Sequence, residues 1–383
     1  MALTIAHISD THIGFRAYAR SDEFGINMRE RDVMLSFVAA LNAIAERDPD
    51  LVVHSGDFFH VVRPSNHAIV STYRRMTEFQ AKRRGKPMVI IAGNHDTPRS
   101  SDSGSLLNLF ATIEGIRVVT QRTESLDLFE VDTEVLCVPH SSLAAQENTS
   151  WRPQLGRKHG VLVLHGMESR IANELGIDTS DFEFGQTSSS HWTYVALGDV
   201  HRHNKLADNA CYPGSTDFAS TDPWGEIGSP KGWVWFDASV GALEFVSVRT
   251  RPVIDLPRID ATGLSPTELT NKLIQNAQWD AEAMPVVRQR IVHVSRETWS
   301  RLGIEWRREL SSRALHYQPI PITAVQGETS SATRDSDLSL EAEWSKHVST
   351  ALIPGGVTRD EVAIKGLEVL QEVEAVEAVA TEA

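Results

Sequence analysis

Uninterrupted apolar runs recur along the chain, and each ends abruptly in polar residues. The run at 88–91 leads into Gly93-Asn94-His95-Asp96, and four comparable runs cover residues 3–8, 51–54, 161–164 and 194–197. Short apolar runs without alternation are typical of buried strands in a parallel sheet. Open α/β sheets carry their chemistry on the loops beyond the carboxyl ends of such strands. The polar residues there are therefore candidates for function, although residues 93–96 alone would also suit an ordinary Asx turn.

Helical spacing of apolar residues appears between the first runs. Residues 32–47 and 66–84 each place apolar side chains on one face, as crossover helices do. Residues 15–30 form a long polar loop in which Arg16, Arg20 and Arg29, with Arg31 directly after the loop, lie near aromatic residues. This loop either contacts a DNA backbone or is simply solvated. Beyond residue 117 most segments are strands, and this order predicts an α/β fold of two packed mixed sheets flanked by helices.

The composition changes near residue 251. Residues 252–320 contain a short helix, an alternating strand at 286–292 and a helix with Arg301, Arg307, Arg308 and Arg313. Residues 321–337 are polar, and later apolar residues such as Trp344 and Val348 are spaced by four. We predict a main domain at 1–250, a small domain at 251–320, a linker at 321–337 and a helical tail at 338–383. The tail either binds a partner or folds back on its own domain.

The net charge of −14 argues against nucleic acid as a partner, but the charge is uneven. Residues 321–383 hold 12 acidic and 4 basic side chains, so −8 of the −14 lies there. Cys137 and Cys211 have neither metal-type nor disulfide-type spacing, which favours reduced thiols in a cytoplasmic protein. No apolar run approaches the roughly 18 residues of a membrane span, and no export signal is recognisable. We expect a cytoplasmic protein with no membrane contact.

The polar residues at the strand ends share one kind of chemistry. They are carboxylates, imidazoles and an amide: Asp10, His12, Asp57, His60, Asn94, His95, His165, Asp199 and His201. Oxygen and nitrogen donors without thiolate favour Mn²⁺ or Mg²⁺ over a structural zinc ion. A single histidine or aspartate at a strand end is usually structural, but repetition at five strand ends indicates a metal site. The sequence contains no glycine-rich phosphate loop of a nucleotide hydrolase.

The order of these motifs resembles a known superfamily. Asp10-Thr11-His12, Gly56-Asp57, Gly93 to Asp96, His165-Gly166 and the Gly-x-x-His at 198–201 resemble the five motifs of calcineurin-like metallophosphoesterases. Residues 56–65 and 212–215 further resemble the nuclease subunit of the SbcCD double-strand-break-repair complex and its counterparts. The resemblance covers residues 1–320. It implies a four-layer α-β-β-α sandwich with a small α+β capping domain and a helical C-terminal tail.

The resemblance also implies residue roles at a two-metal centre. The ligands of one ion would be Asp10, His12, Asp57 and His201. Asp57 would bridge to a second ion, whose other ligands would be Asn94, His165 and Asp199. Catalysis would fall to His95 and His60, with Asp96 orienting His95 by a hydrogen bond. Candidates for DNA contact are Arg16, Arg20, Arg63, Arg288 and Arg290.

The last motif departs from the superfamily, which usually reads Gly-His-x-His. Here Gly198-Asp199-Val200-His201 puts a carboxylate at the first ligand position. Asp199 can still coordinate Mn²⁺, and His203 is the alternative ligand.

The resemblance implies a Mn²⁺-dependent, or alternatively Mg²⁺-dependent, DNA exonuclease and endonuclease. Its partner would be an SbcC-like coiled-coil ATPase that binds the C-terminal helices, and a homodimer is possible. One rival is a phosphodiesterase or phosphatase acting on a small molecule, which would need neither capping domain nor tail. A second rival is an inactive docking scaffold, against which the presence of Asn94 and His95 argues.

Overall fold

The computed structural model describes residues 3–98, 104–145, 151–323, 344, 348 and 358–367. The chain divides into two compact units, residues 1–324 and residues 325–383. The first unit contains two six-stranded sheets and one three-stranded sheet. Residues 324–337 of the predicted linker and most of the predicted tail lie outside the described residues. Residues 321–323, which were predicted as linker, belong to the strand β15 (His316–Thr323) because the strand runs on past the predicted boundary.

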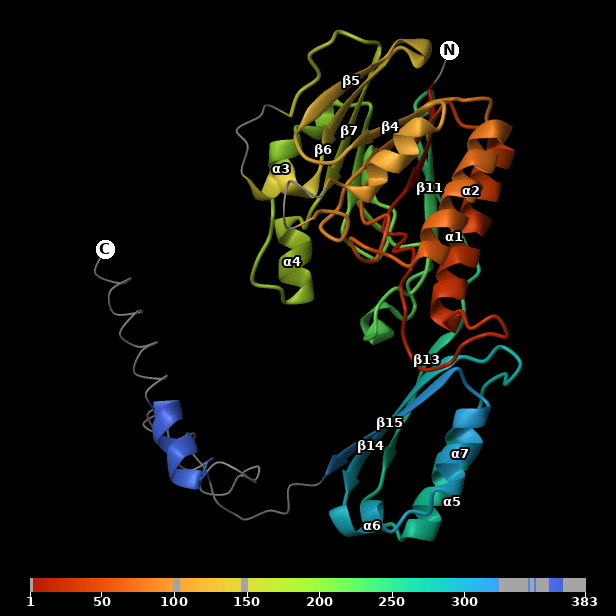
Figure 1. Ribbon diagram of the computed structural model, residues 1–383, viewed down its shortest axis with the longest axis vertical. Helices are drawn as coiled ribbons and strands as arrows, with labels where there is room; N and C mark the ends of the chain where they lie inside the picture. Colours follow the sequence, from red (N-terminus) through yellow and green to blue (C-terminus); the bar gives the residue numbers. More distant parts are fainter. Residues whose placement is uncertain are drawn as a thin grey trace. The chain divides into compact units, whose positions relative to one another are not determined.

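The first sheet has the strand order β12-β11-β1-β2-β3-β4. Its strands are β1 (Thr4–Ile8), β2 (Leu51–His54), β3 (Met88–Ile91), β4 (Ile116–Val119), β11 (Gly232–Asp237) and β12 (Ala242–Ser247). Strands β1 to β4 are parallel, whereas β11 and β12 are antiparallel. Helices α1 (Met28–Arg47) and α2 (Asn66–Lys82) lie side by side over one face of this sheet (Figure 1).

The second sheet has the order β5-β6-β7-β8-β10-β9. Its strands are β5 (Glu124–Leu128), β6 (Thr133–Val138), β7 (His159–His165), β8 (Tyr194–Gly198), β9 (Asn204–Ala207) and β10 (Ala210–Tyr212). Ile171 of α4 (Ser169–Leu175) packs on its outer face together with Phe182 and Trp192. Helix α3 (His140–Ala144) follows β6 directly. Short 3-10 helices are η2 (Leu106–Thr112), η3 (Phe129–Val131), η4 (Phe184–Thr187), η5 (Ser189–His191) and η6 (Pro223–Glu226).

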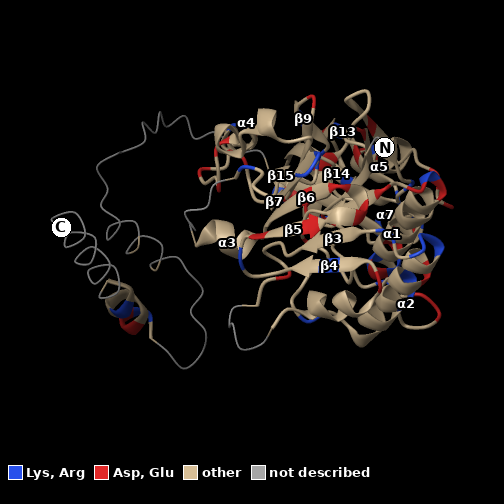
Figure 2. Cartoon of the chain, turned by 90° about the horizontal axis from the view of Figure 1, so that it is seen from above, with Lys and Arg blue, Asp and Glu red and all other residues tan. Residues whose placement is uncertain are grey.

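The two large sheets pack face to face through a shared apolar core. Ile5 and Val89 of the first sheet meet Val135 and Val163 of the second in this core. Because each sheet also packs other elements on its outer face, its central strands are buried on both sides and read as continuous apolar runs. The strands are accordingly mostly uncharged, and charged residues gather on helices and loops (Figure 2). The predicted mixed α/β fold with two packed sheets is confirmed.

Both cysteines belong to this inter-sheet core, and both are free. Burial raises the pKa of the Cys211 thiol to about 12, so it stays protonated at neutral pH. Within the described residues, no helix is long and apolar enough to cross a membrane.

The third sheet lies within the same compact unit. It contains the parallel strands β13 (Val253–Asp260), β14 (Val286–Val294) and β15 (His316–Thr323). Its helices are α5 (Pro266–Asn276), α6 (Arg296–Ser300) and α7 (Glu305–Ser312). These elements share a separate apolar core. The prediction of a domain boundary at residues 250/251 stays a prediction.

Several predicted elements have different bounds in the structure. The strand predicted at 286–292 is β14, which ends at Val294, and the helix predicted at 66–84 is α2, which ends at Lys82. The single arginine-rich helix is two helices, α6 and α7, and Arg301 and Arg313 are the residues that end them. The polar loop predicted to reach residue 30 ends at Asn27, which caps α1 by accepting hydrogen bonds from the amides of Arg29 and Glu30. Arg29 is therefore a buried helical residue, paired with Asp32 and Asp217, and is not available to DNA.

The second unit is described only in part. Residues 359–367 are helical, and the indole nitrogen of Trp344 donates to the carbonyl of Ala363 at 3.1 Å. The predicted helix at 362–376 is thus described as far as residue 367.

Candidate metal centre

Five parallel strands deliver the candidate ligands to one edge of the two sheets. These strands are β1, β2 and β3 of the first sheet and β7 and β8 of the second. The loops are tied together, since the amides of Asp10 and His12 donate to the carbonyls of Gly56 and Asp57 at 3.1 and 3.0 Å. Asp10, His12 and Asp57 all have left-handed backbone conformations, with φ of 49°, 43° and 52°. Such strained residues cluster at functional sites, where surrounding contacts hold them.

Two glycines make room for the converging side chains. Gly56 has φ of +104°, and a Cβ there would overlap the His165 ring. A Cβ at Gly93 would overlap the Asp57 carboxylate. The glycines of these two motifs are therefore required by the close approach of the loops.

Asp10, His12 and His201 form the first group of possible ligands, with donor atoms within 4.8 Å of one another. The Nε2 atoms of His12 and His201 are 2.9 Å apart. Two imidazole nitrogens this close repel each other unless a proton or a cation lies beside them. This arrangement suits a shared cation.

The second group contains Asp10, Asp57 and His165, again with donor atoms within 4.8 Å. Nε2 of His165 lies 3.5 Å from Asp57 Oδ1, 3.6 Å from Asp199 Oδ1 and 3.1 Å from the side-chain amide of Asn94. The two groups share Asp10 and adjoin through Asp57, whose Oδ2 is 3.5 Å from His12 Nε2. The donors predicted for two ions thus surround one compact centre.

Buried negative charge dominates this centre. Burial raises the pKa of Asp57 to about 7, and the carboxylates of Asp10 and Asp96 act in the same direction. Burial alone would lower the pKa of His165, but Asp57, Asp199 and Asp10 together raise it to about 9. Desolvated carboxylates in close contact favour positive charge nearby, and a divalent cation can supply it. The donor set is therefore suited to divalent metal ions.

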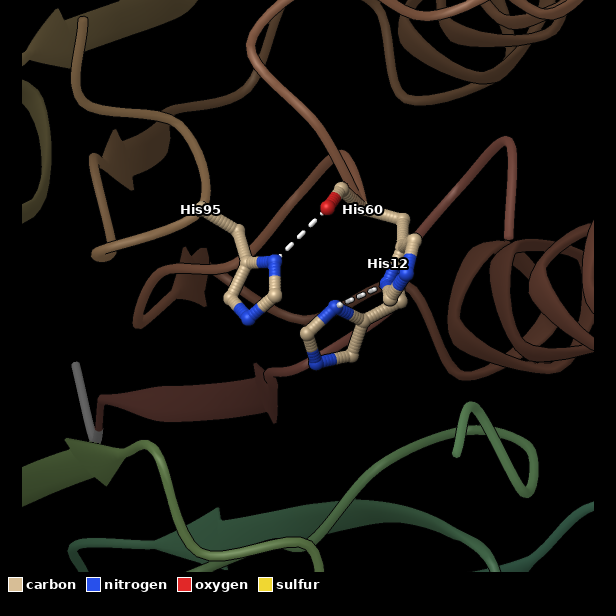
Figure 3. Close-up of side chains that lie close together, drawn as sticks. All are labelled: His12, His60 and His95. Carbon is tan, nitrogen blue, oxygen red and sulfur yellow. Dashed lines mark hydrogen bonds between the residues drawn. The ribbon is translucent and has the colours of Figure 1, made fainter. Parts of the chain in front are cut away.

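His60 and His95 lie at the exposed side of the centre beside His12. Figure 3 shows Nδ1 of His95 pointing to the carbonyl oxygen of His60, at 2.6 Å, and the His60 ring pointing to His12. A carbonyl only accepts, so His95 Nδ1 carries a proton and its Nε2 is left for another partner. Burial, followed by the neighbouring His95 and His201, lowers the pKa of His60 to about 4.

Asp96 does not orient His95 in the way that the sequence suggested. Its carboxylate accepts hydrogen bonds from the amides of Phe58, Phe59 and Gly93, at 2.9, 2.9 and 3.1 Å. It thereby fixes the loop after β3 to the loop after β2. The ring of His95 is held instead by the His60 carbonyl.

A comparison with protein families agrees with this geometry. The model of the calcineurin-like phosphoesterases matches residues 3–220, which is more than half of the chain. The chain belongs to the calcineurin-like phosphoesterase family. All the candidate ligands listed above lie within the matched phosphoesterase region.

Curated relatives of this phosphoesterase carry the name DNA double-strand break repair protein Mre11. The protein from Methanocaldococcus jannaschii is 24% identical over 287 residues, covering 71% of this chain and 73% of that protein. The one from Methanococcus maripaludis is 26% identical over 227 residues, or 57% of this chain and 58% of that protein. The one from Sulfurisphaera tokodaii is 35% identical over 203 residues, or 51% and 48%. The matches thus span between about half and three quarters of these relatives.

The two alternative ligands in the last motif of the phosphoesterase region lie in different surroundings. Asp199 directs its carboxylate towards His165, and its amide donates to both oxygens of Asp10 at 3.2 Å. The Nδ1 atom of His203 instead lies 2.9 Å from the carbonyl of Tyr212, and its ring packs on Phe245 at 4.7 Å.

The arginines suggested for DNA contact differ in how free they are. Arg16 and Arg63 are exposed, and Arg16 pairs with Glu30 at 3.5 Å. Arg20 donates to the carbonyl of Ser311 in α7 at 2.6 Å. Arg288 and Arg290 both pair with Asp255, and Arg288 also lies over the ring of Trp224 at 4.6 Å. A role of these five in binding DNA stays a prediction.

Sequence reasoning missed two side chains behind His201. Glu226 and Lys231 lie in or near the loop between β10 and β11, and Glu226 contacts the His201 ring. Residues 223–231 show no periodicity and lie outside the motifs that carry the resemblance, so nothing in the sequence distinguished these two residues.

Proposed function

We propose that this phosphoesterase is a metal-dependent DNA nuclease of the double-strand-break-repair type. The observation that carries the proposal is the convergence of five strand ends on overlapping groups of metal-type donors, one of which is formed by His12, His60 and His95. The names of the curated relatives supply the substrate class. Exonuclease activity at DNA ends, with endonuclease activity beside it, is part of the proposal.

Two divalent ions, with Mn²⁺ favoured over Mg²⁺, would be held by the seven residues predicted as ligands. The fit rests on the donor chemistry: carboxylate, imidazole and amide atoms without thiolate, around a centre rich in buried negative charge. When bound, such a pair activates a hydroxide and neutralises charge on the phosphodiester. Asp199 is favoured over His203 as a ligand because its carboxylate faces His165.

The chain's own histidines would handle the proton and the phosphate. His95 has its Nδ1 proton fixed on the His60 carbonyl, so its Nε2 side can hold a proton for the leaving oxygen. His60 has a lowered pKa and stays neutral at neutral pH, so it can position the phosphate without adding charge. General acid catalysis of this kind contributes about 10²–10⁴-fold to the rate.

The partner and the location complete the proposal. We expect an SbcC-like coiled-coil ATPase to bind the C-terminal helices, a cytoplasmic location, and a homodimer as a possible assembly. Amphipathic helices beyond a polar linker suit docking into an apolar groove.

The test is digestion of end-labelled duplex DNA by the purified chain, with Mn²⁺, with Mg²⁺ and with a chelator. We expect cleavage with Mn²⁺, none with chelator, and stimulation by the partner ATPase. Hydrolysis of bis(p-nitrophenyl) phosphate with intact DNA would contradict the proposal and favour the small-molecule phosphodiesterase.

A further inference from the structure

His201 is held by a carboxylate from outside the five strand-end motifs. Its Nδ1 lies 3.3 Å from Oε1 of Glu226, a residue of η6 that is 25 positions further along the chain. A carboxylate accepts and does not donate, so the proton of this contact belongs to Nδ1. In that tautomer the lone pair of neutral His201 is on Nε2, which is the atom facing His12.

Glu226 is itself fixed by a buried ammonium group. Lys231 forms an ion pair with its Oε2, and the Lys231 side chain is only 1% exposed. The same Nζ donates to the His201 carbonyl and to Ser215 Oγ, each at 2.8 Å. Lys231 thus holds the backbone of His201 and the carboxylate that contacts its ring. A buried charge pair of this kind is costly to assemble unless its hydrogen bonds are satisfied, as they are here.

From these contacts we infer that Glu226 is a positioning residue for the metal centre, which fixes the ring and tautomer of His201 with the support of Lys231. A histidine ligand commonly donates its other N–H to a carboxylate, which makes the ligand nitrogen more basic. The inference rests on the proposed metal-dependent function and adds a residue to it. Loss of such a partner typically costs about 10–100-fold in metal affinity.

The test is calorimetric titration of the metal-free full-length protein with Mn²⁺, comparing wild type with Glu226→Ala and Glu226→Gln. We expect Glu226→Ala to weaken one of two ions by about 10–100-fold and to leave the other within a few-fold. Glutamine retains an oxygen that accepts from Nδ1 but lacks the charge, so Glu226→Gln should show a smaller loss at the same ion. This graded rescue is what a purely structural role would not produce.

A control is Glu134→Gln, because Glu134 is a buried carboxylate, as Glu226 largely is with a side chain 13% exposed, but it accepts hydrogen bonds from Ser125 and from the amides of Gln154 and Leu155. We expect it to bind both ions as wild type does. If Glu226→Ala does not fold, the near-isosteric Glu226→Gln variant alone tests the inference. We then expect the affinity for one of the two Mn²⁺ ions to fall by at least about three-fold. Equal affinities in Glu226→Gln and wild type, or equal weakening of both ions, would overturn the inference. A wild-type protein that binds no Mn²⁺ would instead refute the proposed function.

Discussion

His165 and His201 both present Nε2 to the metal centre, but their Nδ1 atoms are held by different kinds of group. Nδ1 of His165 donates to the backbone carbonyl of Ser55 at 2.7 Å, and the side chain is fully buried. His201 depends on the Glu226 side chain at 3.3 Å and is 23% exposed. One side of the centre is therefore fixed by a backbone carbonyl directly after β2. The other relies on a loop and on a buried ion pair, and we expect it to be more sensitive to substitution.

The largest effect should come from the residue between the two sides. Asp57→Asn removes a charge from the carboxylate that lies 3.5 Å from both His12 and His165. We expect both Mn²⁺ ions to be lost or strongly weakened and cleavage to fall by about 10³-fold or more, as when a main electrostatic group is removed. Metal analysis after dialysis checks this. The control is Asp127→Asn, a surface aspartate paired with Arg157. Retention of one tightly bound ion would show that Asp57 is a ligand of only one of the two ions.

The next prediction separates chemistry from metal retention. His95→Ala should reduce cleavage by about 10²–10⁴-fold, because it removes the proposed proton donor. Both ions should remain, since the His95 ring is held by a carbonyl and lies outside the predicted ligand set. The exposed His191→Ala serves as control in the cleavage assay and in metal analysis. Loss of metal from the His95 variant would place His95 among the ligands.

The two sides also differ in how far the sequence could predict them. Strands buried on both faces must be apolar throughout, so the ends of β1, β2, β3, β7 and β8 were visible as places where polar residues begin. The contact between His165 at the end of β7 and Ser55 directly after β2 follows from the packing of the two sheets. Glu226 and Lys231 reach His201 only because the loop after β10 folds back, and no periodic pattern encodes such a contact.

The predicted helix boundaries were wrong although the sequence contains local signals for the correct ones. Asn27 and Glu30 have the spacing of a capping box, a recognised signal for a helix start at residue 28. The prediction of one loop over residues 15–30 overlooked this signal and therefore wrongly placed Arg29 in an exposed loop. The break between α6 and α7 falls at Gly303, which disfavours a continuous helix.

Asp199 tests whether the His165 side is complete without the superfamily's usual histidine. We expect Asp199→Ala to lower binding from two Mn²⁺ ions towards one, because its carboxylate lies 3.6 Å from His165. His203→Ala should leave both ions, since its ring packs on Phe245 and its Nδ1 contacts the Tyr212 carbonyl. Asp199→His should restore the second ion by recreating the usual ligand. Calorimetry checks all three, and metal lost from the His203 variant alone would shift the ligand to His203.

The smallest effect is expected at Asp96, which touches neither side directly but ties together the loops that carry Asp57 and Asn94. Asp96→Asn keeps one oxygen acceptor and loses the charge, so at least one of its three backbone hydrogen bonds is lost or weakened. A hydrogen bond to a charged group contributes about 1.5–3 kcal/mol, so we expect the free energy of unfolding to decrease by an amount in that range. Because Asn94 follows the loop glycine that Asp96 holds, the ion on the His165 side should weaken by several-fold and the ion on the His201 side should not. Urea unfolding of the metal-free protein measures the first effect and calorimetry the second. Equal weakening of both ions would mean that Asp96 supports the whole centre through Asp57. In that case the loop that carries Asn94 would not belong to the His165 side alone.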